Sequence, residues 1–600
     1  MEANSVGNWD MTPFFSTPAG SDYAEFVATL QADIESLRAS TDAQSALDDD
    51  SRDRYAELLC DLESVDARLE HLFSYLVCLS AADSGNEWVK QQMAAMESTK
   101  AEADKVRVAL KAALLAASPE HFSSLLGQPA LEGASYYVSR LRKEAEHAMS
   151  TELEQLAADL GVDGISAWGR LYDQVSGSLS FELEHGGNKK TVPVAMTRSL
   201  LESPDADLRA AALAGANKAW ESASEPLAAA LNAISGTRLT LYRRRGIDDF
   251  LAPARFDSGI EAKTLETMFE VVRARRSIPH RYYRLKAKVL GMDKLRFCDT
   301  MAPFPSEDDS RIPWDQAKEL VLGAFGSFYP KLREFAAAAF DQRWIDYEPR
   351  ASKRPGGFCT TSPVIGQSRV FMTYNQTSGD LQTLAHELGH AFHSALMKEM
   401  RYWQTNYPMT LAETASTFAE ALVTDALLAG DLDAKQRLKV LDGKLSDAAT
   451  FLCNTPFRFE FERSLYQERK SGEVSVSRIC ELMTAAQKNS YGDSLDQEQL
   501  DPWFWASKLH FYITEVSFYN FPYTFGYLFS LGIFARAKAE GTGFLDVYER
   551  LLRLTGSAPA EEVAREALGV ELGEPEFWND SIDLIEADLQ AYDEALSELG

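Results

Sequence analysis

Positive charge is scarce in this chain. Its 600 residues include 60 Lys and Arg against 90 Asp and Glu, which gives a formal net charge of −30. A nucleic-acid-binding face must neutralise phosphates with basic residues, and an anionic membrane surface attracts the same residues. The charge balance therefore argues against both nucleic acid and a membrane surface as partners.

Long apolar runs and paired cysteines are also missing. No stretch approaches the roughly 20 apolar residues of a membrane span. No Lys or Arg precedes Arg38, whereas a secretory signal starts with a basic region. The six Cys residues are scattered without close pairs, which is typical of reduced thiols. We therefore expect a cytoplasmic protein, and the sequence leaves open whether it is a monomer or a homodimer.

The first half of the chain is patterned mainly as helices. Between Tyr55 and Leu76, apolar residues recur every three or four positions, as on the buried face of an amphipathic helix. We expect a second helix near Glu87–Ala116, and an internal hairpin of these two helices is favoured over a coiled-coil surface for a partner. Alternating apolar and polar residues around a Gly-Gly pair predict a β-hairpin near residues 178–194.

The strongest chemical signal is His386-Glu387-Leu-Gly-His390. On a helix, two His residues four positions apart lie on one face, so both imidazoles can bind one zinc ion. Glu387 follows the first ligand and can reach a zinc-activated water without binding the metal itself. The chain contains only nine His, so a chance match to this pattern is rare. A helix with solvent-facing His is the alternative.

A catalytic zinc ion with two His needs a third protein ligand and an open position for water. The metzincin pattern would place that ligand at Leu396, and His393 lies two helical turns from His386, too far to share the ion. We expect His393 to make a hydrogen bond or a packing contact. Glu413, in a segment of small residues, is the best candidate ligand. Glu420 can orient a His ligand by accepting a hydrogen bond from its other ring nitrogen.

Residues 353–374 lack the helical pattern of the segments around them. Gly356 and Gly357 permit a tight turn, and Arg369–Tyr374 is patterned as a strand. An edge strand beside the zinc helix can pair with the backbone of a peptide. Gly357 and Tyr374 are therefore candidate substrate-binding residues.

Residues 503–530 are rich in aromatic side chains. Most of the Phe and Trp side chains are expected in the core, but buried hydroxyl and imidazole groups need hydrogen-bond partners. If they face the zinc, such groups can stabilise the oxyanion that forms when water attacks a peptide carbonyl. The candidates are His510, Tyr512, Tyr519, Tyr523 and Tyr527.

Five stretches carry a further signal when they are taken together: Lys353–Cys359, Leu384–Ser394, Tyr407–Glu420, Phe459–Glu462 and His510–Tyr527. Together they resemble the zinc oligopeptidase family that includes oligoendopeptidase F and, more distantly, thimet oligopeptidase. They keep the family's order over about residues 290–530.

The resemblance implies a mainly α fold, a large two-lobed helical metallopeptidase with a deep channel and a small sheet beside the zinc helix. It implies His386, His390 and Glu413 as zinc ligands, with one Zn²⁺ per chain, and Glu387 as general base and acid. It also implies that His510 and tyrosines of the C-terminal segment contact the substrate and stabilise the tetrahedral intermediate. We carry the catalytic role onto His510, Tyr519 and Tyr527, and substrate binding onto Tyr512 and Tyr523 as well as Gly357 and Tyr374.

The sequence thus predicts a zinc metalloendopeptidase that hydrolyses internal bonds of short peptides. We expect an N-terminal helical domain over residues 1–200 and a catalytic domain over residues 201–600. The alternatives are a zinc aminopeptidase, another amide hydrolase, or a catalytically inactive helical peptide-binding protein.

Overall fold

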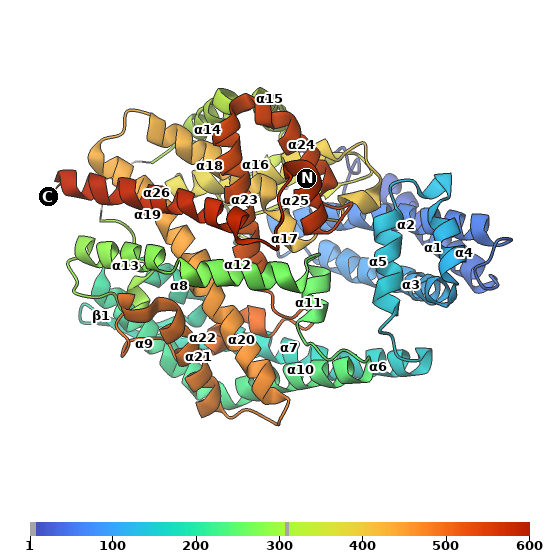
Figure 1. Cartoon of the computed structure of the whole chain (residues 1–600), viewed down its shortest axis with the longest axis horizontal. Helices are drawn as coiled ribbons and strands as arrows, with labels where there is room; N and C mark the ends of the chain where they lie inside the picture. The colour runs from blue at the N-terminus through green and yellow to red at the C-terminus, as the bar shows by residue number, and fades with distance from the viewer. Residues whose placement is uncertain (1–7, 306–310, 600) are drawn as a thin grey trace. The chain divides into compact units, whose positions relative to one another are not determined.

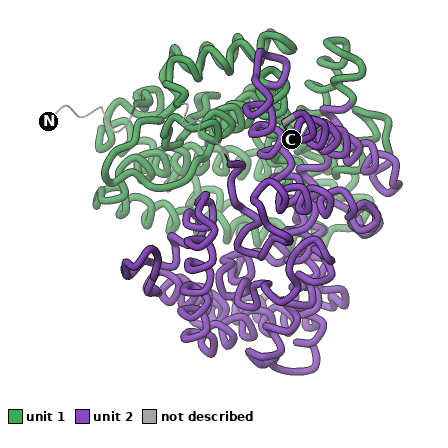
Figure 2. Tube along the Cα trace, turned by 90° about the vertical axis from the view of Figure 1, so that its left-hand side faces the viewer, with its two compact units in different colours: residues 1–147, 310–427, 536–570 green, residues 148–309, 428–535, 571–600 purple. Residues whose placement is uncertain are grey.

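Most of the chain is helical, and its two sheets are small (Figure 1). The structure is a computed structural model, and it describes residues 8–305 and 311–599. The prediction of a mainly α protein is confirmed. The chain folds into two compact units, each built from three separate segments of the sequence (Figure 2). Unit 1 contains residues 1–147, 310–427 and 536–570, and unit 2 contains residues 148–309, 428–535 and 571–600. The predicted boundary between residues 200 and 201 divides the sequence in another way and stays a prediction.

The apolar pattern between Tyr55 and Leu76 lies in unit 1. That pattern forms one long helix, which packs against the helix at Glu87–Ala116, so the internal hairpin is confirmed. The Asn86 side chain accepts a hydrogen bond from Val89 N at 3.1 Å and fixes the start of the second helix. The helices of unit 1 are α1 (Ser21–Asp42), α2 (Arg52–Ala82), α3 (Glu87–Ala116), α4 (Pro119–Leu126), α5 (Ser135–Ala145), α14 (Trp314–Phe328), α15 (Pro330–Asp341), α16 (Ser378–Leu396), α17 (Met409–Ala412), α18 (Thr414–Ala429), α24 (Leu545–Leu554) and α25 (Ala560–Leu568).

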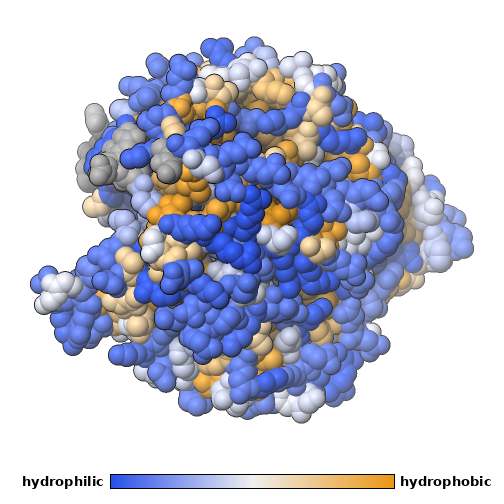
Figure 3. All heavy atoms as spheres, turned by 60° about the vertical axis from the view of Figure 1, so that its left-hand side comes forward, coloured by the Kyte–Doolittle hydropathy of each residue, from blue (hydrophilic) through white to orange (hydrophobic). Residues whose placement is uncertain are grey.

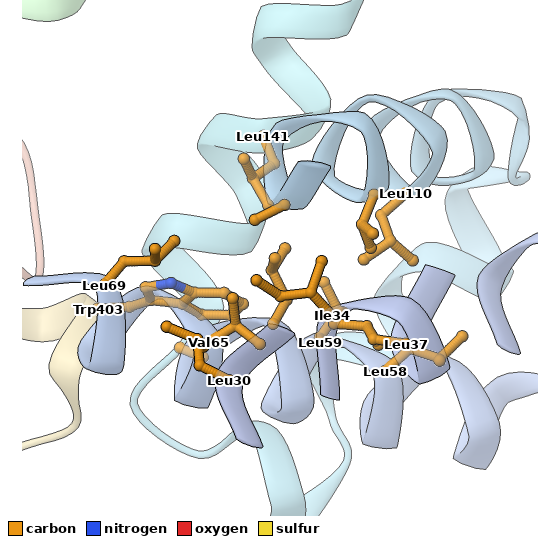
Figure 4. Packing of buried hydrophobic residues seen from close by; sticks show 14 of the residues in the cluster. Leu30, Ile34, Leu37, Leu58, Leu59, Val65, Leu69, Leu110, Leu141 and Trp403 are labelled. Carbon is orange, nitrogen blue, oxygen red and sulfur yellow. The ribbon is translucent and has the colours of Figure 1, made fainter. Parts of the chain in front are cut away.

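The core of unit 1 is built from the inward faces of α1, α2, α3 and α5 (Figure 4). Leu30 on α1, Leu58 on α2 and Leu110 on α3 are fully buried in it, and Trp403 reaches the same cluster from a distant part of the sequence. Burying one such Leu side chain stabilises the fold by about 1.5–3 kcal/mol. This packing holds α2 against the segment that carries the site described below.

The sheet of unit 1 has three strands, β3 (Ile345–Asp346), β4 (Phe358–Ser362) and β5 (Gln367–Phe371), in the order β3-β5-β4. β5 is parallel to β3 and antiparallel to β4. The predicted strand at Arg369–Tyr374 is confirmed in part, because β5 ends at Phe371 but the pairing continues through Tyr374 N to Tyr347 O at 2.9 Å. α16 packs against β4 and β5, so the small sheet lies beside the helix that carries the His-Glu motif, as predicted.

Unit 2 contains the predicted β-hairpin and most of the remaining helices. Strands β1 (Ser180–His185) and β2 (Asn188–Pro193) pair antiparallel around Gly186 and Gly187, both at positive φ. Its helices are α6 (Thr151–Asp163), α7 (Ile165–Ser178), α8 (Thr197–Leu201), α9 (Ala206–Ser222), α10 (Ser224–Arg244), α11 (Ala252–Asp257), α12 (Ala262–Ala274), α13 (Ser277–Val289), α19 (Ala434–Ala449), α20 (Thr455–Arg469), α21 (Val476–Tyr491), α22 (Phe504–Ser507), α26 (Pro575–Leu599) and α23 (Phe521–Glu540), whose last turn continues into unit 1.

The face drawn in Figure 3 is mostly hydrophilic, and its hydrophobic side chains form small, separate patches. Among residues 8–305 and 311–599, no helix carries an apolar stretch long enough to cross a bilayer.

Candidate metal centre

The site is organised by α16, whose start is fixed by its own side chains. Thr377 Oγ1 accepts a hydrogen bond from Asp380 N at 3.1 Å, and the Asp380 carboxylate accepts one from Thr377 N at 2.9 Å. This capping box satisfies two backbone donors at the first turn and sets the direction of the helix. His386 and His390 then lie one turn apart on the face that lines a cavity.

A close approach of α18 to α16 brings the third candidate into place. A Cβ atom at Gly389 would lie 2.6 Å from Ala415 O and 2.7 Å from Ser416 Cα. No residue with a side chain fits at such distances, so the glycine between the two His residues allows the backbones to meet. Because Ala415 and Ser416 closely follow Glu413, this contact fixes where the Glu413 carboxylate lies.

Three ligand atoms form a small triangle at this point. His386 Nε2 and His390 Nε2 are 3.1 Å apart, and Glu413 Oε2 lies 3.3 Å from the former and 3.4 Å from the latter. A four-coordinate metal ion with bonds of about 2.0–2.1 Å holds its ligand atoms about 3.3 Å apart. Within the part of the chain that the structure describes, these residues are also the one group of His, Cys, Asp or Glu side chains arranged to hold a metal ion.

Glu420 contacts the first histidine from the side opposite the triangle. Its carboxylate lies 2.5 Å from His386 Nδ1. A carboxylate can only accept here, so Nδ1 carries the proton and Nε2 points to the triangle. Burial of the imidazole ring opposes protonation, but the hydrogen bond to Glu420 and the nearby carboxylates raise the pKa of His386 to about 9. The surroundings therefore stabilise positive charge, which a bound metal ion supplies.

Glu413 lies between two helices and not within one. α17 ends at Ala412 and α18 begins at Thr414, so the helical path is interrupted at Glu413. The break lets the Glu413 side chain turn towards the two histidines, and Ser416 Oγ donates a hydrogen bond to its Oε2 at 2.7 Å. Burial of the Glu413 carboxyl group opposes ionisation, but the hydrogen bond with His390 and the charges of both histidines lower its pKa to about 2.

Glu387 is held in a nearly dry position. Its side chain is 6% exposed, and its Oε2 has no hydrogen-bond partner among the described residues. Burial raises the pKa of Glu387, and His386 and His390 oppose that shift. A buried carboxylate with an unsatisfied oxygen beside a cavity is positioned to accept a proton from a bound water molecule.

A cavity of about 810 Å³ opens on the triangle entirely within unit 1. Its walls include α2, the whole of β4, Gly357 and the loop around Tyr407. β4 is an edge strand, whereas β5 is covered on both sides by β3 and β4. Val370 and Phe371 have strand partners on both sides, so they are not free to pair with a peptide, and the pairing expected for the whole of Arg369–Tyr374 stays a prediction. β4 is the strand whose outer edge no other strand covers.

Two predicted substrate-binding residues of unit 1 differ in their surroundings. Gly357 lines the cavity, and a Cβ atom added to it would lie 3.4 Å from Glu387 Oε1. Tyr374 is 4% exposed, and its hydroxyl donates to Ile312 O at 2.8 Å, so that hydroxyl is occupied within the fold. Its substrate role stays a prediction.

His393 makes structural contacts, as predicted. It is fully buried, and its Nε2 lies 3.0 Å from both Leu552 O and Thr555 Oγ1. Its ring stacks on Tyr407 with the centroids 4.4 Å apart. Burial lowers the pKa of His393 to about 3, so the ring is neutral and joins α16 to α24.

The remaining predicted residues belong to unit 2. The rings of His510, Tyr519 and Tyr523 form a cluster with centroids 5.5–5.9 Å apart, and all three are partly exposed. Tyr527 stacks on Phe451 at 4.5 Å. The structure thus brings His510, Tyr519 and Tyr523 together, but it leaves their catalytic and substrate-binding roles as predictions.

Tyr512 lies deeper than the other tyrosines. It is 1% exposed and stacks on Tyr172 with the centroids 3.9 Å apart. Its hydroxyl has no hydrogen-bond partner among the described residues. The substrate contact predicted for Tyr512 would require that stack to open.

Sequence reasoning missed three features of the metal centre. Gly389 sets the distance between α16 and α18, and nothing in the spacing of the motif indicates this role. The sequence also does not show that β4, and not the strand at Arg369–Tyr374, lies at the edge of the sheet. Ser416 is the third feature, and a hydroxyl three residues after a candidate ligand is a sequence signal for a hydrogen bond to that ligand.

Comparisons with known proteins agree with this geometry. The model of peptidase family M3 matches residues 199–583, and the model described as oligopeptidase F matches residues 114–181. An oligoendopeptidase F homolog of Lactococcus lactis subsp. lactis is 25% identical over 602 residues, covering 98% of this chain and 96% of the relative. Oligopeptidase PepF of Bacillus subtilis is 23% identical over 559 residues, covering 92% and 81%.

Solved structures show the same fold. Oligoendopeptidase-F from Enterococcus faecium has a TM-score of 0.71 at 19% identity, with 96% of this chain and 99% of that chain covered. A structure from Chlamydophila abortus has a TM-score of 0.83 at 20% identity, with 99% of both chains covered. Because the family model spans more than half of the chain and includes the metal-ligating triangle, the chain belongs to peptidase family M3 and is a metallopeptidase.

Proposed function

We propose that this metallopeptidase hydrolyses internal bonds of short peptides, with one zinc ion held by His386, His390 and Glu413. The triangle of ligand atoms, with sides of 3.1–3.4 Å, carries this proposal. Two neutral nitrogens and one carboxylate are a donor set that suits zinc in hydrolytic sites and leaves a fourth position open. The relatives named oligoendopeptidase support internal cleavage of short peptides over the other reactions that the sequence leaves open.

The chemistry divides between the ion and Glu387. When bound, zinc supplies a Lewis acid that polarises the scissile carbonyl and lowers the pKa of the attacking water. Glu387 accepts the proton of that water at its Oε2 and passes it to the leaving amine. The dry surroundings of Glu387 raise its pKa, which helps it to hold the proton between these two steps. Glu420 keeps His386 in the tautomer that offers Nε2.

The peptide aligns along β4. No other strand covers the outer edge of β4, which lines the cavity together with Gly357, so an extended substrate can pair there beside Thr361 O, which already accepts a hydrogen bond from Ser74 Oγ at 3.0 Å. The small size of Gly357 leaves room for the substrate backbone beside Glu387. The resemblance adds His510, Tyr519 and Tyr527 as groups that stabilise the oxyanion, and Tyr512, Tyr523 and Tyr374 as further substrate contacts.

A peptide blocked at both ends with an internal quencher pair tests this function. We expect cleavage at an internal bond, loss of cleavage on chelation, and recovery with one equivalent of Zn²⁺. An aminopeptidase would leave the blocked peptide intact and cleave only the free form. A protein that retains no zinc and cleaves neither peptide would be a binding protein and not an enzyme. A cytoplasmic location and a monomeric or homodimeric state remain part of the proposal.

A further inference from the structure

Three carboxylates follow one another along one face of α2. Glu63, Asp66 and Glu70 are spaced three and four residues apart, so they lie on neighbouring turns of the helix. Glu63 and Asp66 are buried, and Glu70 is partly buried. Of the three, Glu70 alone lines the cavity that contains the metal-ligating triangle. Glu70 and the metal centre therefore share one cavity within unit 1.

The first two carboxylates have arginine partners. Arg401 Nε donates a hydrogen bond to Glu63 Oε2 at 2.9 Å. Arg107 Nη2 donates one to Asp66 Oδ1. The backbone and indole N–H groups of Trp403 also donate to these two carboxylates, each at 3.0 Å. Both charges are thus used to join α2 to distant segments of the fold.

Glu70 is not neutralised in this way. Within the described residues it makes no ion pair, and Lys100 on α3 acts on it only as a nearby charge. The contact of Ser74 Oγ with Glu70 Oε1, at 3.5 Å, is at the limit of a hydrogen bond. Ser74 has a single hydroxyl proton, and Thr361 O accepts it at the shorter distance of 3.0 Å. Burial raises the pKa of the Glu70 carboxyl group. A carboxylate that is withdrawn from water without a cation is costly to the fold, and this one lines a cavity that a cation can enter.

Glu70 also lies beside the strand on which the substrate is proposed to align. Ser74, one turn further along α2, contacts the outer edge of β4 at Thr361 O. The other end of β4 follows Gly357, where a Cβ atom would lie 3.4 Å from Glu387 Oε1. Four residues of extended strand separate Gly357 from Thr361, which is about 13 Å. A peptide that follows β4 away from Glu387 therefore reaches Glu70 about four residues from the cleaved bond.

We propose that Glu70 determines specificity by binding a positively charged group of the peptide substrate, an ammonium or guanidinium group about four residues from the cleaved bond. This inference deepens the proposed function and rests on it. A hydrogen bond between a carboxylate and a cation is stronger than one between neutral groups. The Lys and Arg side chains of the cavity, Arg354 and Lys398, are exposed and make no ion pair with Glu70 in the part of the chain that the structure describes, so its charge stays available to the substrate. The substrate supplies the cation from its amino terminus or from a Lys or Arg side chain.

Equilibrium binding to the zinc-loaded Glu387→Gln protein tests this role without requiring turnover. The reference is a labelled peptide without charged groups, blocked at both ends. It is compared with the same peptide carrying a free amino terminus and with versions carrying one Lys at each position in turn. We expect one cationic form to bind about 10- to 100-fold more tightly than the reference. Preference for the free amino terminus assigns the site to the terminal ammonium group, and preference for one Lys position assigns it to a side chain. Equal binding of all forms, or one gain shared by every position, would overturn the proposal.

Glu70→Gln, added to the same protein, should remove this preference while the affinity for the uncharged peptide stays the same. Glu57→Gln is the matched control, because Glu57 is on the same helix, is exposed, pairs with Arg54 at 2.7 Å and does not line the cavity. The control should keep the preference. Glu70→Gln should also keep its melting temperature, since no ion pair is lost. A preference that survives Glu70→Gln would overturn the proposal, and a lower melting temperature would then make Glu70 a structural residue.

The cleavage site of the wild type in the preferred peptide, mapped by mass spectrometry, tests the placement without any variant of Glu70. We expect the cleaved bond about four residues from the cation. Cleavage directly beside the cation would overturn the inference. Failure of the wild type to cleave blocked peptides would overturn the proposed function alone, since the binding preference is measured separately.

Discussion

Two clusters of charged side chains, one in each unit, treat charge in opposite ways. In unit 1, His386 and His390 are surrounded by the carboxylates of Glu387, Glu413 and Glu420, and the pKa of His386 rises to about 9. In unit 2, Arg458 and Lys508 make no ion pair with any carboxylate that the structure describes, and burial together with the charges of Arg458 and Arg198 lowers the pKa of Lys508 to about 7. The first cluster stabilises an added cation and the second an added anion.

Each cluster keeps groups of like charge close together. Groups of like charge remain close together in a folded protein only where another part of the structure holds them. The close contact of α18 with α16 holds the carboxylates of unit 1, and the Phe504 ring holds the cations of unit 2.

The largest effect is expected from Glu387→Gln in unit 1. The substitution keeps the shape of a side chain that has no partner at Oε2 but removes its ability to take a proton. We expect kcat to fall by about 10³-fold or more, while zinc content measured by elemental analysis stays at one per chain. A variant that still cleaves peptides at the wild-type rate would remove Glu387 from the mechanism.

A smaller effect is expected from Glu420→Gln. The amide weakens the hydrogen bond that orients His386, so zinc affinity should fall by about 10- to 100-fold. Competition with a chelator of known affinity measures this change. Activity at saturating zinc should largely return, and a variant with unchanged zinc affinity would show that the Glu420 contact plays no part in binding the ion.

Gly389→Ala tests the packing that places Glu413. A methyl group there collides with the backbone of α18, so we expect a loss of about 1–3 kcal/mol in unfolding free energy together with weaker zinc binding. Gly443→Ala on α19 is the matched control, since a Cβ atom at Gly443 meets nothing within 4 Å. The control should be neutral or slightly stabilising in thermal unfolding. Equal melting temperatures for the two variants would contradict the close approach.

Local patterns account for much of what the sequence predicts correctly. The stripe from Tyr55 to Leu76, the Gly-Gly hairpin and the His386/His390 pair depend on the spacing of near neighbours, and all three form as expected. The helix break at Glu413 and the edge position of β4 depend on contacts between distant segments, so spacing alone does not reveal them. The approach of Arg458 on α20 to the Phe504 ring, which Lys508 also contacts, is likewise a contact between distant segments.

Anomalous diffraction at the zinc absorption edge, from crystals of the active enzyme, tests the metal centre most directly. We expect one strong peak per chain, about 2.0–2.1 Å from the Nε2 atoms of His386 and His390 and in bonding contact with the Glu413 carboxylate. A fully active enzyme with no peak there, or with its zinc bound at other residues, would contradict the account.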